Sequence, residues 1–111
     1  MTSRVLAGTA TQIDSLPLPQ DQVGSGVPTA GILDFGTDGF ACGLWEHSVG
    51  VSTDVEADEV FVVLSGRARI EIAGQPDLEI QPGDVVSLEA GTETTWHVTE
   101  PLRKFWVTAT G

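Results

Sequence analysis

The chain has 111 residues, which is enough for one domain with one hydrophobic core but too few for two. Sixteen acidic residues against five basic ones give a net charge of -11, which would repel nucleic acid and anionic membrane surfaces, so neither is an expected partner. The single cysteine Cys42, an amino terminus without a secretory pattern and the lack of a long apolar run indicate a cytoplasmic protein.

Residues 1–30 are predicted to form an N-terminal arm and residues 31–111 the folded domain. The arm mixes small, polar and proline residues, as in 16–19 and 24–28. Such an arm can lie along a sheet edge or on a neighbouring subunit, shielding backbone groups that would otherwise promote aggregation. A disordered tail is the alternative, and the sequence leaves both open.

The rest of the chain is built from short runs rich in valine and isoleucine, separated by glycine and proline turns, with no sustained helical period. Gly66 reads as the end of one strand and Pro101 as a break before the last strand, while the segment 36–39 reads as a turn. The pattern predicts an all-β sandwich or barrel, with strands at 31–35, 40–47, 59–66, 67–72, 78–80, 85–88 and 92–98 and a last strand after Pro101. The segment 48–58 is either a loop or an edge strand.

The predicted strand 40–47 carries the first candidate binding residues, Trp45 and Glu46. Alternation along a strand places Trp45 on the same face as His47, and Glu46 on the opposite face. Trp45 is either a wall of a ligand site or an anchor of the core or an interface, because a large ring buries much apolar surface.

Glu59 is the candidate catalytic residue. Alternation places Glu59 on the same face of the strand as Phe61 and Val63. A carboxylate that points into an apolar interior must be paired, liganded or protonated. A cavity lined by Phe61, Val63 and Trp96 would raise its pKa by desolvation and suit it to proton transfer. The neighbouring acids, Asp54, Glu56 and Asp58, read as solvated surface.

The C-terminal segment alternates as well. Thr94 and Trp96 share one face of the predicted strand 92–98, which leaves His97 on the other. Arg103 and Lys104 are neighbours on the last strand, so one can point inward to an acid while the other points out, or both can form surface ion pairs. Which of the two points inward is left open.

The spacing from Glu59 to Gly66, followed by the turn 82–84 and by Gly91, resembles the cupin superfamily. More narrowly, the pairs at 45–46, 58–59, 83–84 and 103–104, together with Trp96, resemble the ureidoglycine aminohydrolase-like branch of the cupins. The resemblance covers residues 40–108. It implies a single-domain jelly-roll antiparallel β-barrel.

Metal-binding cupins carry a His-x-His pair, a glutamate and a later histidine. When that pattern is aligned with this chain, the two positions of the His-x-His pair correspond to Ser52 and Asp54, or to Thr53 and Val55. The position of the later histidine corresponds to Thr94. The oxygens of Glu59 and Asp54 are a poor site for iron, zinc or copper, so no cofactor is expected. A divalent ion held by Glu59, Asp54 and His47 is the alternative.

Three functions follow from these residues and from the resemblance. The first is a metal-free cupin that binds a small polar molecule around Glu59, with ligand contacts from Trp45, Glu46, Asp54, Phe61, Thr94 and Trp96. The second is a metal-assisted hydrolase of the ureidoglycine aminohydrolase type, which would release ammonia. The third is a non-enzymatic binding or scaffolding module with a filled barrel. A homodimer is expected in each case, because the apolar run 60–64 indicates burial on both faces.

Overall fold

The computed structural model describes residues 3–36 and 39–109. Strands form nearly all of the regular structure of these residues, which also include one short 3-10 helix, η1 (Gln20–Gln22), and the predicted all-β class is confirmed. The predicted turn at 36–39 lies partly outside the described residues. The strands are β1 (Leu16–Pro17), β2 (Val23–Ser25), β3 (Thr29–Asp34), β4 (Phe40–His47), β5 (Gly50–Val55), β6 (Glu59–Ile72), β7 (Leu78–Ile80), β8 (Val85–Leu88) and β9 (Glu93–Ala109).

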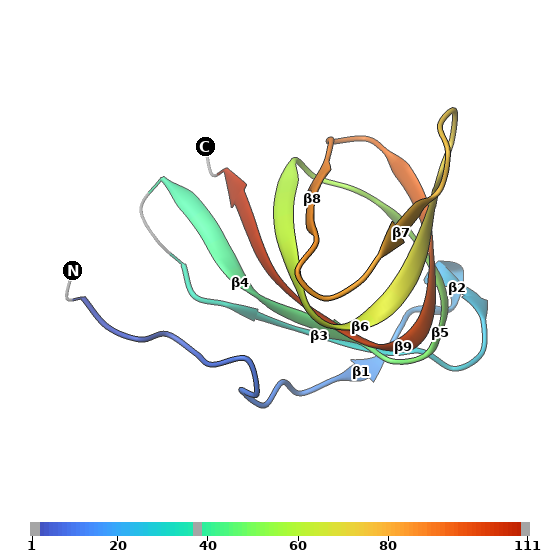
Figure 1. Ribbon diagram of the computed structural model, residues 1–111. Coiled ribbons are helices and arrows are strands. Elements are labelled where there is room, and N and C mark those ends of the chain that lie inside the picture. Colours follow the sequence, from blue (N-terminus) through green and yellow to red (C-terminus); the bar gives the residue numbers. More distant parts are fainter. Residues whose placement is uncertain (1–2, 37–38, 110–111) are drawn as a thin grey trace.

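The two longest strands, β6 and β9, lie side by side and form the spine of the fold (Figure 1). The other edge of β9 pairs first with β5 and then with β4, while β6 carries the short strands β7 and β8 on its far edge. All of these pairings are antiparallel. The sheet curls into a ring with one face inside, which is the barrel that the sequence predicts.

The inner face of the ring is the hydrophobic core. Alternation along β6 and β9 sends every second side chain inward, as expected for strands with one dry face. On β9 the predicted facing is confirmed, since Thr94 and Trp96 are buried and His97 lies on the outer side, where its ring contacts Glu71. The most deeply buried apolar side chains include Phe61, Val63, Ile70, Trp96, Val98, Leu102 and Trp106.

Both long strands bend near Gly66 instead of ending there. The prediction that Gly66 ends a strand and that Pro101 separates two strands is wrong, since β6 and β9 each run through these positions with shifts of register between Val63 and Ala68. Gly66 has φ of 90°, and a Cβ at this position would lie 2.1 Å from the carbonyl oxygen of Pro101. A glycine at a bulge therefore lets the strand turn a corner without losing its continuity.

The N-terminal segment lies against the chain's own sheet. β1 pairs with β3 at one end of the strand order and β2 pairs with β5 at the other, so both edges are covered. Ile13 is buried, and the guanidinium group of Arg103 donates to the carbonyl oxygens of Thr9 and Thr11. Of the alternatives that the sequence leaves open, the described residues adopt the sheet-edge arrangement.

We expect Gly66→Ala to lower the free energy of unfolding by about 2 kcal/mol or more beyond the loss caused by Gly74→Ala. Both glycines have a positive φ, 90° and 83°, but only at Gly66 would the added methyl group meet backbone atoms, because nothing lies within 4 Å of the corresponding position at Gly74. Urea denaturation measures the difference. Equal losses in the two variants would show that the contact with Pro101 is unimportant.

Candidate functional site

A cavity of about 160 Å³ lies beside inward side chains of the barrel, and its wall also includes the exposed residues Ile32 and Asp54. Its wall combines carboxylates, one ammonium group and aromatic rings, which is the mixture of polar and apolar groups typical of small-molecule sites. All three tryptophans of the chain belong to it. The lining residues are Ile32, Trp45, Asp54, Glu56, Glu59, Trp96, Lys104 and Trp106.

Lys104 and Glu59 form a buried ion pair in this cavity. Nζ of Lys104 lies 3.0 Å from Oε2 of Glu59, and the two side chains are 6% and 12% exposed. Lys104 points inward because it alternates on β9 with Leu102 and Trp106, which are both buried. The open choice at 103–104 is thereby resolved, with Lys104 inside the barrel. Alternation with Trp106 was a signal in the sequence that could have identified the inward residue.

Three aromatic rings surround the ammonium group of Lys104. Its Nζ lies 4.6 Å from a ring centroid of Trp45, 4.3 Å from that of Phe61 and 4.9 Å from that of Trp96. A cation over a desolvated ring is stabilised by about 2 kcal/mol. The rings and Glu59 together form a cage for one ammonium group, and the chain's own lysine occupies it.

Glu56 is the cavity residue that the sequence analysis missed, since it assigned this acid to solvated surface. Its Oε1 accepts hydrogen bonds from Oγ1 of Thr94 at 2.8 Å and from Nε1 of Trp96 at 3.1 Å. Burial raises the pKa of Glu56, the two hydrogen bonds and the charge of Lys104 oppose this, and the charge of Asp54 adds to it. A buried indole N–H requires an acceptor, and this requirement was the only feature of the sequence that pointed to an acid beside Trp96.

Backbone hydrogen bonds hold Glu56 in place. Its N–H donates to the carbonyl oxygen of Thr92 at 2.9 Å, and its own carbonyl oxygen accepts from the N–H of Gly91 at 2.8 Å. Oδ1 of Asp58 accepts from the N–H of Ala90 at 2.8 Å. The loop between β5 and β6 is thus joined to the turn before β9, which positions the Glu56 carboxyl group beside Trp96.

Four of the predicted site residues line the cavity: Trp45, Asp54, Glu59 and Trp96. Two more, Phe61 and Thr94, contact the residues that line it, Phe61 through Nζ of Lys104 and Thr94 through the carboxyl group of Glu56. Asp54 is exposed, and its Oδ1 accepts from the N–H of Val55 at 2.8 Å.

Glu46, which was also predicted to contact the ligand, lies outside the cavity. It follows Trp45 on β4 and therefore points to the outer face. Its carboxylate accepts from Nη2 of Arg103 and from Oγ of Ser15, both at 2.8 Å. These contacts tie the N-terminal segment to the outside of the barrel, so the placement of Glu46 beside a barrel ligand is corrected.

His47 points into the barrel, and both of its ring nitrogens are engaged. Nε2 lies 2.8 Å from Oγ of Ser52, and Nδ1 lies 2.5 Å from the carbonyl oxygen of Ser48. Burial lowers the pKa of His47, while the contact with Ser48 opposes the shift. The ring is therefore a buried structural group with two fixed neighbours.

The donor set does not fit a transition metal. Of the positions aligned with the metal ligands of cupins, Ser52 contacts His47, Thr94 donates to Glu56 and Glu59 pairs with Lys104. Within residues 3–36 and 39–109, no group of three or more histidine, cysteine, aspartate and glutamate side chains could hold a metal ion. Iron, zinc and copper favour nitrogen or sulfur ligands, which these positions lack.

Trp106 supplies an unused hydrogen-bond donor. It is 4% exposed and lines the cavity, and its Nε1 is buried without a hydrogen-bond partner among the described residues. A buried donor without a partner destabilises a protein by about 1–3 kcal/mol. An acceptor atom on a bound molecule would remove this penalty.

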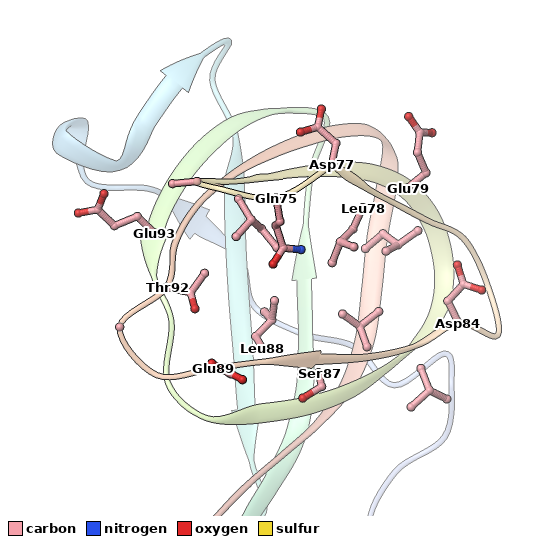
Figure 2. A pocket seen from close by; sticks show the side chains of 16 residues that line it. Gln75, Asp77, Leu78, Glu79, Asp84, Ser87, Leu88, Glu89, Thr92 and Glu93 are labelled. Carbon is pink, nitrogen blue, oxygen red and sulfur yellow. The ribbon is translucent and has the colours of Figure 1, made fainter.

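A larger hollow of about 960 Å³ opens between β7 and β8, which pair with β6 but not with each other. Figure 2 shows Gln75 and Leu78 over this hollow, with Asp77 and Glu79 at its edge. These acids are exposed, and Asp77 already pairs with Arg69 at 2.8 Å. The hollow also includes the buried apolar side chains of Ile80, Val86 and Leu88. Its acids are exposed or half-buried, whereas the smaller cavity holds the largely buried ion pair of Glu59 and Lys104, so the smaller cavity is the candidate site.

A curled antiparallel barrel with a cavity among its inward side chains is the architecture of a cupin. The chain belongs to the EutQ-like cupin domain family, which matches residues 36–106. Among curated proteins, none matches the chain. In the described part of the chain, no helix has the length and apolarity to cross a membrane.

Solved structures share this fold at low sequence identity. An ethanolamine utilization protein Q from Salmonella typhimurium LT2 has a TM-score of 0.73 and 18% identity over 95% of this chain and 84% of that one. EutQ of Clostridium difficile has a TM-score of 0.68 and 20% identity over 85% and 79% of the two chains. Ectoine synthase of P. lautus has a TM-score of 0.63 and 19% identity over 82% and 70%. These likenesses show the fold alone.

We expect the stability of the protein to fall on acidification below about pH 6.5 because of His47. Its folded-state pKa lies below its ordinary value of 6.5, so the unfolded chain takes up the proton first. The contribution is complete above that value and is lost as the pH falls through the folded-state pKa. Urea denaturation at a series of pH values measures it. His47→Gln should flatten the slope while the outer-face control His97→Gln retains it, and an unchanged slope in His47→Gln would contradict the assignment.

Proposed function

We propose that this protein binds a small polar molecule in the barrel cavity, without a tightly held transition metal. The observation that carries the proposal is that the cavity of about 160 Å³ reaches both Glu56 and Glu59. This volume corresponds to about five water molecules, so the ligand has only a few non-hydrogen atoms. The cavity also argues against a barrel completely filled by side chains.

The groups around the cavity supply complementary hydrogen-bonding roles. Glu59 is a hydrogen-bond acceptor beside the ammonium group of Lys104. Glu56 is a second carboxyl group at the cavity, held by Thr94 and Trp96, and burial raises its pKa. Trp106 adds an N–H group without a partner in the described structure. A ligand with both donor and acceptor atoms satisfies this arrangement, and the tryptophan rings enclose its apolar part.

A metal-dependent hydrolase of the ureidoglycine aminohydrolase type remains the alternative function. Such chemistry uses a divalent ion to orient the substrate and to stabilise charge. Of the side-chain oxygens at the corresponding positions, those of Ser52, Glu59 and Thr94 are engaged by His47, Lys104 and Glu56, and only Asp54 lacks such a side-chain partner in the described part of the chain, which favours the metal-free proposal. Proteins of the same fold include an ectoine synthase, so the fold by itself supports no single reaction for this chain.

Tryptophan fluorescence tests the proposal directly, because every tryptophan of the chain lines the cavity. We expect a screen of small polar compounds to give a saturable change that is unaltered by prior dialysis against EDTA. Glu56→Gln should weaken the affinity for the best compound by up to about tenfold, because a hydrogen bond from the ligand to the carboxyl group is lost. Glu79→Gln, at the exposed hollow, is the matched control. No saturable response, or a response abolished by EDTA, would contradict the proposal.

We further propose that the protein forms a homodimer. The outer faces of β6 and β8 carry exposed valines, with Val60 48% exposed and Val85 72% exposed, and burial of such surface favours association. Sedimentation equilibrium should give the mass of two chains. Val60→Lys should shift the equilibrium toward one chain, whereas Val27→Lys, in the N-terminal segment, should leave it unchanged. A wild-type protein with the mass of one chain would refute the dimer.

A further inference from the structure

We propose that the hollow between β7 and β8 binds an extended, basic segment of a partner protein as an added strand. The inference goes beyond the proposed function, because it concerns a different site. The hollow has a volume of about 960 Å³, and none of its lining residues belongs to the cavity of about 160 Å³. Every residue of β7 and β8 lines the hollow, so a partner seated there would contact both strands.

The open edges of β7 and β8 suit the addition of a strand. Each of the two pairs with β6 on one edge, and no strand of the described residues pairs with the other edge. By contrast, the N-terminal segment covers both ends of the strand order, with β1 on β3 and β2 on β5. An open edge presents backbone N–H and C=O groups with which a further strand can pair.

Apolar side chains form the floor of the hollow. Ile80, Val86 and Leu88 are buried, and Ile72 and Leu78 are half-buried. Side chains of an extended segment point alternately to opposite sides, so every second one would face this floor. Because burial of apolar surface is favourable, the floor predicts an apolar residue at every second position of the bound segment.

Charge selects the kind of partner. Among the described residues that line the hollow there is no lysine, arginine or histidine. Figure 2 shows Glu89 and Glu93 on one side of the hollow and Glu79 and Asp84 on the opposite side. Opposite charges across an interface favour encounter and specificity, so the remaining positions of the segment are basic. A second copy of this chain, with its net charge of -11, would be repelled, which leaves a basic partner as the occupant.

Short and charged edge strands also have a purely structural explanation, since they protect a sheet from aggregation. β7 has three residues and β8 has four. That explanation predicts that no added strand binds at either edge, whatever its charge. A binding experiment therefore separates it from the proposed docking.

Fluorescence anisotropy with a labelled peptide tests the inference. The peptide alternates lysine and valine, and we expect it to bind the full chain saturably. A peptide that alternates glutamate and valine should bind at least about tenfold more weakly, because the acids of the hollow repel it. The absence of saturable binding by the lysine–valine peptide, or equal affinities of the two peptides, would overturn the inference.

Two methylated peptides separate strand addition from simple charge attraction. Both keep the lysine–valine sequence, and they carry methyl groups on the backbone nitrogens either of the lysines or of the valines, so that each loses the donors on one edge. At least one of them should bind about tenfold more weakly than the unmodified peptide, because hydrogen bonds to the open edge are lost. Unchanged affinity of both, or displacement of the peptide by spermine at a similar concentration, would refute the added strand. Only the peptide differs in this comparison, so it decides the question even where a variant fails to fold.

Charge reversal locates the bound peptide. Glu89→Lys, at an exposed residue of the hollow, should weaken the affinity for the lysine–valine peptide by about fivefold. Asp21→Lys makes the same change of charge at an exposed residue of η1, outside the hollow, and should leave the affinity within about twofold of the wild type. Circular dichroism checks that both variants are folded. Equal losses in the two variants would place the peptide elsewhere on the acidic surface and overturn the docking site.

Discussion

The buried ion pair between Lys104 and Glu59 is the interaction on which the barrel interior depends. Each charge is acceptable there only because the other lies 3.0 Å away and because the rings of Trp45, Phe61 and Trp96 surround the ammonium group. Removal of one partner of such a pair destabilises a protein by about 3–5 kcal/mol, since the remaining charge stays buried without compensation. The pair therefore constrains both the core and the chemistry of the cavity.

The fold brings the two charges together through the long pairing of β6 with β9. Glu59 begins β6, and Lys104 lies in the second half of β9, across the same ladder. The bend at Gly66 lets one continuous pair of strands form two sides of the barrel, so the β6–β9 pairing reaches from this ion pair to Ile70 and Trp96. β4 then adds Trp45 from the neighbouring edge of β9. A rigid sheet on several sides holds the cavity open at a defined size.

The position of the ammonium group also explains why a metal site and this cavity are alternatives. The glutamate of the metal-binding cupin pattern corresponds to Glu59, which here faces a cation supplied by the chain itself. Of the remaining positions, Ser52 and Thr94 are hydroxyl groups engaged by His47 and Glu56, and Asp54 is an exposed carboxylate that accepts from the N–H of Val55. Lys104 thus places a positive charge inside the barrel, beside the acids that line the cavity.

Local patterns along the chain determined the class of fold and, for many residues, the face of the strand on which the side chain lies. Alternation between apolar and polar residues identified the strands and placed Glu59, Phe61 and Trp96 on inner faces, because side-chain direction on a strand follows a period of two. The same period predicted that Arg103 and Lys104 point to opposite sides. The strand ends were misread at Gly66 and Pro101, because a glycine that ends one strand and a glycine at a bulge within another have the same local signature.

Only the tertiary structure decided which distant residues meet. Lys104 and Glu59 are 45 positions apart, and Glu56 lies 38 positions from Thr94 and 40 from Trp96. Such contacts depend on the register between strands and on a loop joined to a remote turn, and neither is encoded in the local pattern of the residues involved. Sequence alone therefore determined an acidic all-β barrel with an inward glutamate, while the pairing of its strands determined that Lys104 and a second carboxyl group, that of Glu56, share the cavity.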